Sequence, residues 1–139
     1  MNQENYVNRG DQPCLINIHH AACSNPNYRK EIWTGDHLQI TVMSIPAGGE
    51  IGLEVHDDLD QMLRIEYGVA TVYMGATKQA VRFVGNANSD YAIVVPAGTW
   101  HNVLNIQNVP LKLYSVYAPP KHPVGTLQPT KFDADLADE

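Results

Sequence analysis

Cysteine is scarce in this chain, since Cys14 and Cys23 are the only two among 139 residues. A secreted domain held by a disulfide framework usually carries more, and no apolar signal segment precedes these two. We therefore expect two reduced thiols in a cytoplasmic protein. His19 and His20 lie near Cys23 in the sequence, but their spacing matches no usual zinc pattern, so we interpret these three residues as incidental.

Positive charge is also sparse. Nine Lys and Arg stand against fifteen Asp and Glu, which gives a net charge of −6. The basic residues are scattered, and a nucleic-acid surface needs them clustered to neutralise phosphates. No apolar run approaches the roughly 18 residues of a membrane span. We therefore predict neither a nucleic-acid partner nor a membrane one, and expect a small-molecule substrate.

The length and composition are those of one ordinary globular domain, with 44% hydrophobic and 17% charged residues. Short segments rich in β-branched and aromatic residues recur at close spacing, separated by Gly, Asn and Pro. Strands that repeat without helical patterns between them predict an all-β sandwich or barrel. The expected strands are residues 37–45, 50–56, 61–67, 69–74, 80–85, 91–96, 101–106 and 111–118.

The ends of the chain read differently from the middle. We expect residues 1–35 to form an N-terminal arm, residues 36–118 the barrel, and residues 119–139 a C-terminal tail outside the β core. The tail begins with a proline-rich piece, "APPKHPVGTLQP", that could lie across the mouth of the barrel. The acidic "DADLADE" that follows is most simply a solvated end.

One stretch carries polar side chains where a core wants apolar groups. Residues i and i+2 of a strand share a face, so Glu54 and His56 are predicted to project together. A turn would then bring Gln61 back beside them. In a second stretch, His101 starts a strand after the tight turn Pro96-Ala97-Gly98. Converging oxygen and nitrogen donors of this kind suit a divalent transition metal.

These two stretches resemble the two motifs of the cupin superfamily. The first motif reads G-x5-H-x-H-x4-E-x6-G, and this chain has at the corresponding positions Gly48, Glu54, His56, Gln61 and Gly68. The second reads G-x5-P-x-G-x2-H-x3-N, and here the chain has Asp90, Pro96, Gly98, His101 and Asn105. The resemblance covers residues 36–118 and implies a double-stranded β-helix, the jelly-roll barrel of cupins.

The resemblance also implies a metal site. Carried over position by position, the ligands are Glu54, His56, Gln61 and His101, with Zn, Mn, Ni or Fe as the cofactor. Glu54 stands where the family has its first histidine, and Gln61 stands where it has the glutamate; both can still donate oxygen. The alternative for Gln61 is a hydrogen bond to His56.

The altered ligand set resembles that of the sugar-isomerising cupins. Phosphomannose isomerases use Gln, His, Glu and His around zinc, and some cupins that open unsaturated uronate rings place a glutamine at the position of Gln61. This similarity favours an enzyme that acts on a small sugar or oxo-acid by isomerase or tautomerase chemistry. The alternatives are an Fe(II) dioxygenase and a non-catalytic small-molecule-binding cupin.

No general acid or base follows from the motifs. His122 could close over the mouth as acid or base, or remain a solvated tail histidine. The possible proton donors on strands are Tyr67, Tyr73, Tyr114 and Tyr117, although a strand tyrosine more often packs. Exposed strand edges and an N-terminal arm also lead us to expect a homodimer, with residues 6–35 contributing to its interface.

Overall fold

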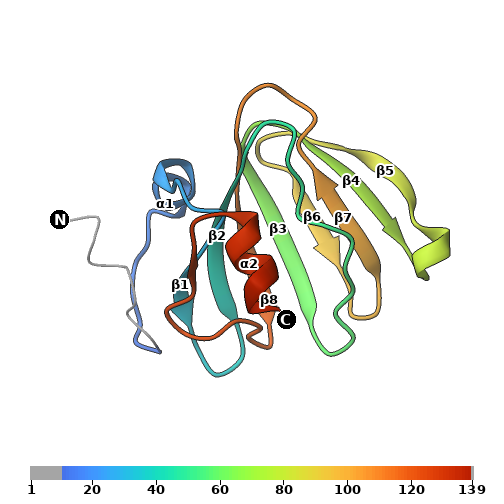
Figure 1. Ribbon diagram of the computed structural model, residues 1–139. Helices are drawn as coiled ribbons and strands as arrows, with labels where there is room; N and C mark the ends of the chain where they lie inside the picture. Colours follow the sequence, from blue (N-terminus) through green and yellow to red (C-terminus); the bar gives the residue numbers. More distant parts are fainter. Residues whose placement is uncertain (1–10, 139) are drawn as a thin grey trace.

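The computed structural model describes residues 11–138 and consists mainly of antiparallel strands in two sheets (Figure 1). A six-stranded sheet has the order β6-β3-β8-β2-β1-β9, and a three-stranded sheet has the order β5-β4-β7. The strands are β1 (Arg29–Thr34), β2 (Gln39–Ile45), β3 (Asp60–Tyr67), β4 (Ala70–Gly75), β5 (Arg82–Ala87), β6 (Ala92–Val95), β7 (Trp100–Leu104), β8 (Leu111–Ala118) and β9 (Leu127–Gln128). This architecture confirms the expected all-β jelly roll.

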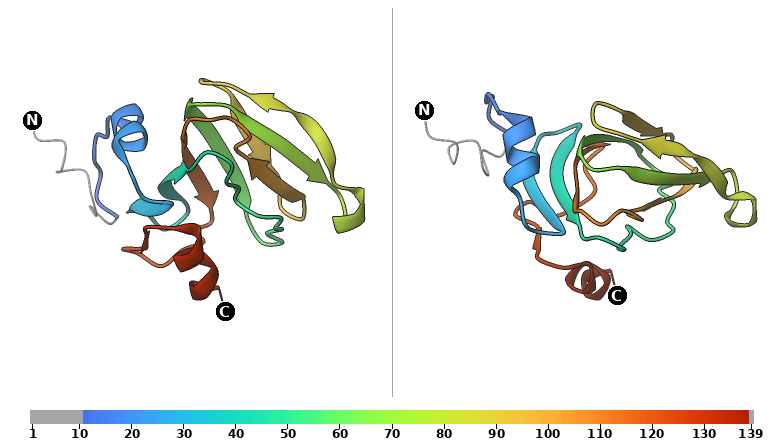
Figure 2. Two further views of the ribbon diagram at one scale, coloured as in Figure 1. Left: turned by 45° about the horizontal axis from the view of Figure 1, so that its top comes forward. Right: turned by 90° about the horizontal axis from the view of Figure 1, so that it is seen from above.

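The two sheets curve around a common interior, which the view from above in Figure 2 shows. The interior is filled by side chains that alternate along the strands, as in β3, where Leu63 and Ile65 are fully buried. The core joins both sheets, since Val72 of β4 and Val103 of β7 belong to the same apolar cluster as Leu113 of β8. The two sheets therefore share one apolar core.

Seven of the eight expected strands are confirmed, and the expected strand at 50–56 is wrong. That segment makes only two isolated bridges to β7, through Glu50 and Glu54. Gly52 interrupts the strand because its φ of 105° lies outside the β region, and its amide donates to the Asn102 side chain at 2.9 Å. The residues 50–56 thus follow the edge of β7 as a loop.

The prediction that residues 1–35 lie outside the β core is wrong for Arg29–Thr34. These residues form β1, which pairs with β2. Helix α1 (Ile18–Ser24) precedes β1 and packs on the outer face of the sheet. Asn17 caps its N-terminus, since its side chain accepts from the amide of His20. Alternating side chains place Arg29 and Glu31 toward the interior, a charged pair that does not look like core in the sequence.

The C-terminal segment is also more ordered than a solvated tail. Strand β9 pairs with β1, and a helix, α2 (Lys131–Ala137), follows it. Thr130 and Asp133 form a capping box at the start of α2, which satisfies two amides that the first turn leaves unpaired. Most of the acidic run therefore lies within α2, and Ala134 of this helix is buried against the barrel.

No helix in residues 11–138 is long and apolar enough to cross a membrane. Strands β1 and β9 thus belong to the six-stranded sheet, while the division of the chain into domains and the homodimer stay predictions; residues 6–10 of the expected interface lie outside the described residues.

Candidate metal centre

The two motif stretches meet through backbone pairing. The amide of Glu54 donates to the carbonyl of His101 at 3.0 Å, and the amide of His101 donates back to Glu54 at 2.9 Å. In the turn before β7, the amide of Gly98 also donates to the carbonyl of His56, at 2.8 Å. Gly98 has a φ of 83°, which a side chain would disfavour. The tight turn before β7 therefore fixes the loop that carries Glu54 and His56.

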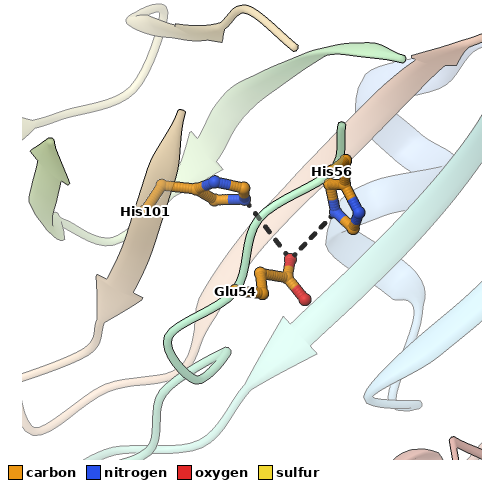
Figure 3. Close-up of side chains that lie close together, drawn as sticks. All are labelled: Glu54, His56 and His101. Atoms are coloured by element: carbon orange, nitrogen blue, oxygen red, sulfur yellow. Dashed lines mark ion pairs between the residues drawn. The ribbon is translucent and has the colours of Figure 1, made fainter. Parts of the chain in front are cut away.

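Three of the four expected ligands come together at this junction (Figure 3). The Glu54 Oε1 atom lies 3.3 Å from Nε2 of His56 and 3.4 Å from Nε2 of His101. All three donor atoms lie within 4.8 Å of one another, close enough to hold one metal ion. It is the single such cluster of His, Cys, Asp and Glu in the described range, and it contains neither His19 nor Cys23.

The tautomer of His101 follows from its other nitrogen. Nδ1 lies 2.9 Å from the carbonyl oxygen of Thr99, which can only accept, so Nδ1 carries the proton. The lone pair of Nε2 then faces Glu54. Metal-ligating histidines are commonly oriented by such a backbone contact. His101 is 1% exposed, so its orientation is held by packing as well.

Electrostatics at the site favour a positive charge beside Glu54. Burial alone would raise the pKa of the Glu54 carboxyl, but the two imidazoles outweigh it and hold that pKa well below its usual range. Burial would likewise lower the pKa of His101, and the contact with Glu54 raises it overall. Nε2 of His56 and Nε2 of His101 are buried and make no hydrogen bond. A cation between these groups would satisfy all three.

Gln61 lies on β3 with its side chain inside the barrel, 4% exposed. Its Nε2 donates to Oγ of Ser115 at 2.9 Å, while its Oε1 is buried with no hydrogen-bond partner. The donor is thus used by Ser115, and the amide makes no hydrogen bond to His56. The free carbonyl oxygen is compatible with a fourth ligand, which stays a prediction.

The mouth of the barrel holds a cavity of ≈ 170 Å³ beside Glu54 and His56. The proline-rich segment reaches this cavity, because the Gln39 side chain binds it at three points. Its Oε1 accepts from the amides of Lys121 and His122, at 3.1 and 2.8 Å, and its Nε2 donates to the carbonyl of His122. His122 thereby lines the cavity, with Nε2 3.4 Å from the hydroxyl of Tyr117.

Arg29 also lines this cavity, and the sequence did not single it out. Its only signal was its place in the strand-like "RKEIWT", where alternation puts it on the same face as Glu31. Charged residues are mostly exposed, so alternation alone would assign both to solvent. Gln39 of β2 is buried as well, and its polar side chain holds the segment at 121–122.

Comparisons with known proteins place these features in a family. No family model matches the chain. It is 52% identical over 130 residues to the uncharacterized protein YrkC of Bacillus subtilis, covering 94% of this chain and 70% of YrkC. The crystal structure of BH2720 from Bacillus halodurans superposes with a TM-score of 0.91 at 50% identity, covering 94% of this chain and 98% of that one.

A more distant structure is the cupin domain of Cnp3 from Schizosaccharomyces pombe. It has a TM-score of 0.58 and 20% identity and covers 66% of this chain and 64% of that one, which speaks for the fold alone. The fold and the polar mouth are those of a single-barrel double-stranded β-helix. The chain has the double-stranded β-helix fold that the cupin domain of Cnp3 also has, and it belongs to the family that includes YrkC and BH2720.

Proposed function

We propose that this protein is a metal-dependent enzyme that isomerises or tautomerises a small sugar or oxo-acid, with Glu54, His56, Gln61 and His101 as the metal ligands. The observation that carries the proposal is the convergence of one carboxylate and two imidazole nitrogens beside a cavity that also holds a histidine and a tyrosine. Metal-assisted proton transfer needs both the cation site and a cavity with a proton-transferring group beside it, and both are present.

The donor set fits a divalent transition metal. Three buried atoms that could donate to a cation have no hydrogen-bond partner, namely Nε2 of His56, Nε2 of His101 and Oε1 of Gln61. Leaving such atoms unpaired is costly, and imidazole and oxygen donors suit Zn, Mn, Ni and Fe. When bound, the ion supplies Lewis acidity, which polarises a carbonyl or hydroxyl oxygen.

The protein's own contribution is proton transfer at the cavity. Nε2 of His122 and the hydroxyl of Tyr117 form a pair at 3.4 Å, and both residues line the cavity. In the proposed reaction, a proton leaves the carbon next to a carbonyl and is taken up by His122, with Tyr117 relaying it to the neighbouring position. No electrons are lost or gained overall, so no oxidant is needed.

The test is exchange with solvent. Protein loaded in turn with Zn, Mn, Ni and Fe(II) is incubated in D2O with aldose phosphates, uronates and 2-oxo-acids, and NMR follows deuterium at the carbon next to the carbonyl. We expect deuterium incorporation or isomerisation with at least one metal and one substrate, and none with His101→Ala. Absence of exchange with every combination would overturn the proposal, and oxygen uptake by the iron form would replace it with the dioxygenase.

The titration of His122 gives a separate prediction about acid stability. Burial and the charges of Arg29 and Lys121 lower the pKa of His122 to about 3 from 6.5. Between these values the unfolded chain binds a proton that the folded chain does not, so stability falls as the pH falls through this window. We expect His122→Asn to lose less melting temperature than the wild type between pH 7 and pH 4.

The matched control for that experiment is His37→Asn, which changes an exposed histidine outside the cavity. It should follow the wild-type profile. Equal losses of melting temperature for wild type and His122→Asn would show that His122 is protonated normally, and that it does not sit in the buried position described.

A further inference from the structure

Arg29 is a buried cation without an acidic partner. Its side chain lies inside the mouth of the barrel, and the residue is 6% exposed. Nη1 donates to Oε1 of Gln128 at 2.8 Å, and the guanidinium lies over the ring of Tyr28 at 5.2 Å. Nε is buried and has no hydrogen-bond partner. Within residues 11–138, Arg29 makes no ion pair with any Asp or Glu.

Such an arrangement is unfavourable unless something completes it. A buried charge is normally paired and hydrogen-bonded, because removing it from water is energetically costly. Arg29 cannot avoid this cost by losing its proton; burial opposes its charged form, but its neighbours Tyr117, Tyr28 and Glu54 raise its pKa overall. The fold therefore holds a permanent positive charge beside the candidate metal ligands.

We propose that Arg29 binds the carboxylate of the substrate, so that the substrate of this site is a small hydroxy- or oxo-acid. This inference deepens the proposed function and rests on it for the reacting end of the molecule. Arg29 and Glu54 line the same cavity of ≈ 170 Å³, so a compact acid can reach both at once. Lys121, which lines this cavity as well, adds a second positive charge at its rim.

The geometry of the guanidinium favours a carboxylate in particular. Gln128 takes up Nη1, while Nε has no hydrogen-bond partner. Two parallel N–H groups match the two oxygens of a carboxylate in a bidentate pair. A phosphate would bring a third oxygen and a second negative charge, and Glu54 and Asp138 line the same cavity with charges that repel it. Monocarboxylates are thus the better match.

Binding an acid there would also prepare His122. The positive charges of Arg29 and Lys121 are two of the causes that lower the pKa of His122. A carboxylate between them would offset these charges and make His122 a better proton acceptor. Substrate binding and proton transfer would then be linked through the one charge on Arg29.

The experiment compares matched acids and neutral analogues by isothermal titration calorimetry in a buffer free of carboxylate and phosphate. The pairs are glucuronate with glucose, and pyruvate with acetone; glucose 6-phosphate tests the phosphate alternative. Each is titrated into the full chain as purified and into metal-stripped protein. The variants are Arg29→Met, Arg29→Lys and the control Arg64→Met, which removes a more exposed arginine on β3.

We expect at least one acid to bind both protein forms and its neutral analogue to bind at least about 30-fold more weakly, the factor lost when one partner of a buried charge pair is removed. Arg29→Met should lose the same factor for the acid alone, Arg29→Lys should lose less, and Arg64→Met nothing. Because a buried cation is being replaced by an apolar chain, Arg29→Met should keep the wild-type melting temperature or exceed it.

Three results would overturn the inference: equal acid binding by Arg29→Met and wild type, equal binding of acids and neutral analogues, or Arg29-dependent binding of glucose 6-phosphate alone. Failure of the proposed function looks different. If metal never binds but the acids still bind through Arg29, the inference stands and the metal-dependent reaction is rejected. If metal binds at one equivalent and no acid depends on Arg29, the inference fails alone.

Discussion

Replacing His101 by alanine is expected to reduce the bound transition metal from near one equivalent per chain to near zero. His101 offers a buried Nε2 whose lone pair is fixed toward Glu54 by the contact of Nδ1 with the carbonyl of Thr99. Loss of a group that only orients a ligand already costs 10–100-fold in metal affinity, so loss of a ligand should cost at least about 100-fold. Elemental mass spectrometry on untagged protein, purified without chelators, measures the result.

His19→Ala is the control, because His19 is an exposed histidine that contacts Glu66 on the outside of the barrel and belongs to no cluster of three donors. His56→Ala gives a second ligand variant at a less buried position. Added metal should raise the melting temperature of wild type and of His19→Ala, and leave both ligand variants unchanged, since only a protein that binds the ion is stabilised by it. Near-stoichiometric metal in His101→Ala would contradict the assignment of His101 as a ligand. If no variant and no wild-type protein held metal even after reloading, the metal-dependent reaction would be rejected in favour of a role in binding small molecules.

The strand pattern predicted the barrel because period-two alternation survives in most of its strands. In β8, every second residue from Leu111 to Tyr117 is buried, and the sequence alternates accordingly at Leu111 and Leu113, whereas Ser115 is a buried polar residue. The turn chemistry was equally readable: Gly98 has the positive φ that the tight turn before β7 needs. Asn105, the last position of the second motif, stabilises the turns beside it, since its Nδ2 donates to the backbone carbonyls of Ile45, Pro46 and Val109.

The meeting of Glu54, His56 and His101 was predictable for a reason that does not depend on regular strand structure. The loop at 50–56 is not a strand, yet the backbone bonds between Glu54 and His101 hold it at the same register that a strand would have. The spacing of the motif therefore places the three side chains correctly even where the secondary-structure prediction fails. The contact of Gln61 with Ser115, in contrast, joins two residues that are 54 positions apart on neighbouring strands. No local sequence pattern predicts such a contact.

The place of Arg29 in the mouth could not be predicted, because a charged residue is expected at the surface. The proline-rich piece was expected as one that could lie across the mouth, but no sequence pattern identified the contacts that hold it there. Their burial follows from tertiary partners: Gln128 on Arg29, and Gln39 on the backbone at 121–122. A sequence pattern predicts contacts between residues that are close together in the chain. The partners of Arg29 and of the segment at 121–122 are far from them in the sequence.

Gln39 is the residue on which the closed mouth depends most, and Gln39→Met is expected to lower the free energy of unfolding by about 2–4 kcal/mol. The amide is fully buried and pairs with the two amides at Lys121 and His122, with the carbonyl of His122 and with Oγ1 of Thr34. Methionine has a similar length but offers none of these partners. Each buried backbone group left unpaired costs about 1–3 kcal/mol, and the segment recovers part of that by moving into water.

The same change should release His122 from the cavity, which a simple loss of stability would not do. In the wild type, NMR titration should find the pKa of His122 at about 3. In Gln39→Met this pKa should return toward 6.5, because the segment is no longer held against Arg29 and Tyr117.

Urea unfolding measures the change in stability. The control is Gln107→Met, at an exposed glutamine in a surface turn, which should alter neither the stability nor the pKa of His122. If Gln39→Met loses stability while His122 keeps its low pKa, the other contacts of the segment hold the mouth closed and Gln39 only fills the interior. If both change together, one buried amide links the fold of the barrel to the proton-transfer side of its cavity.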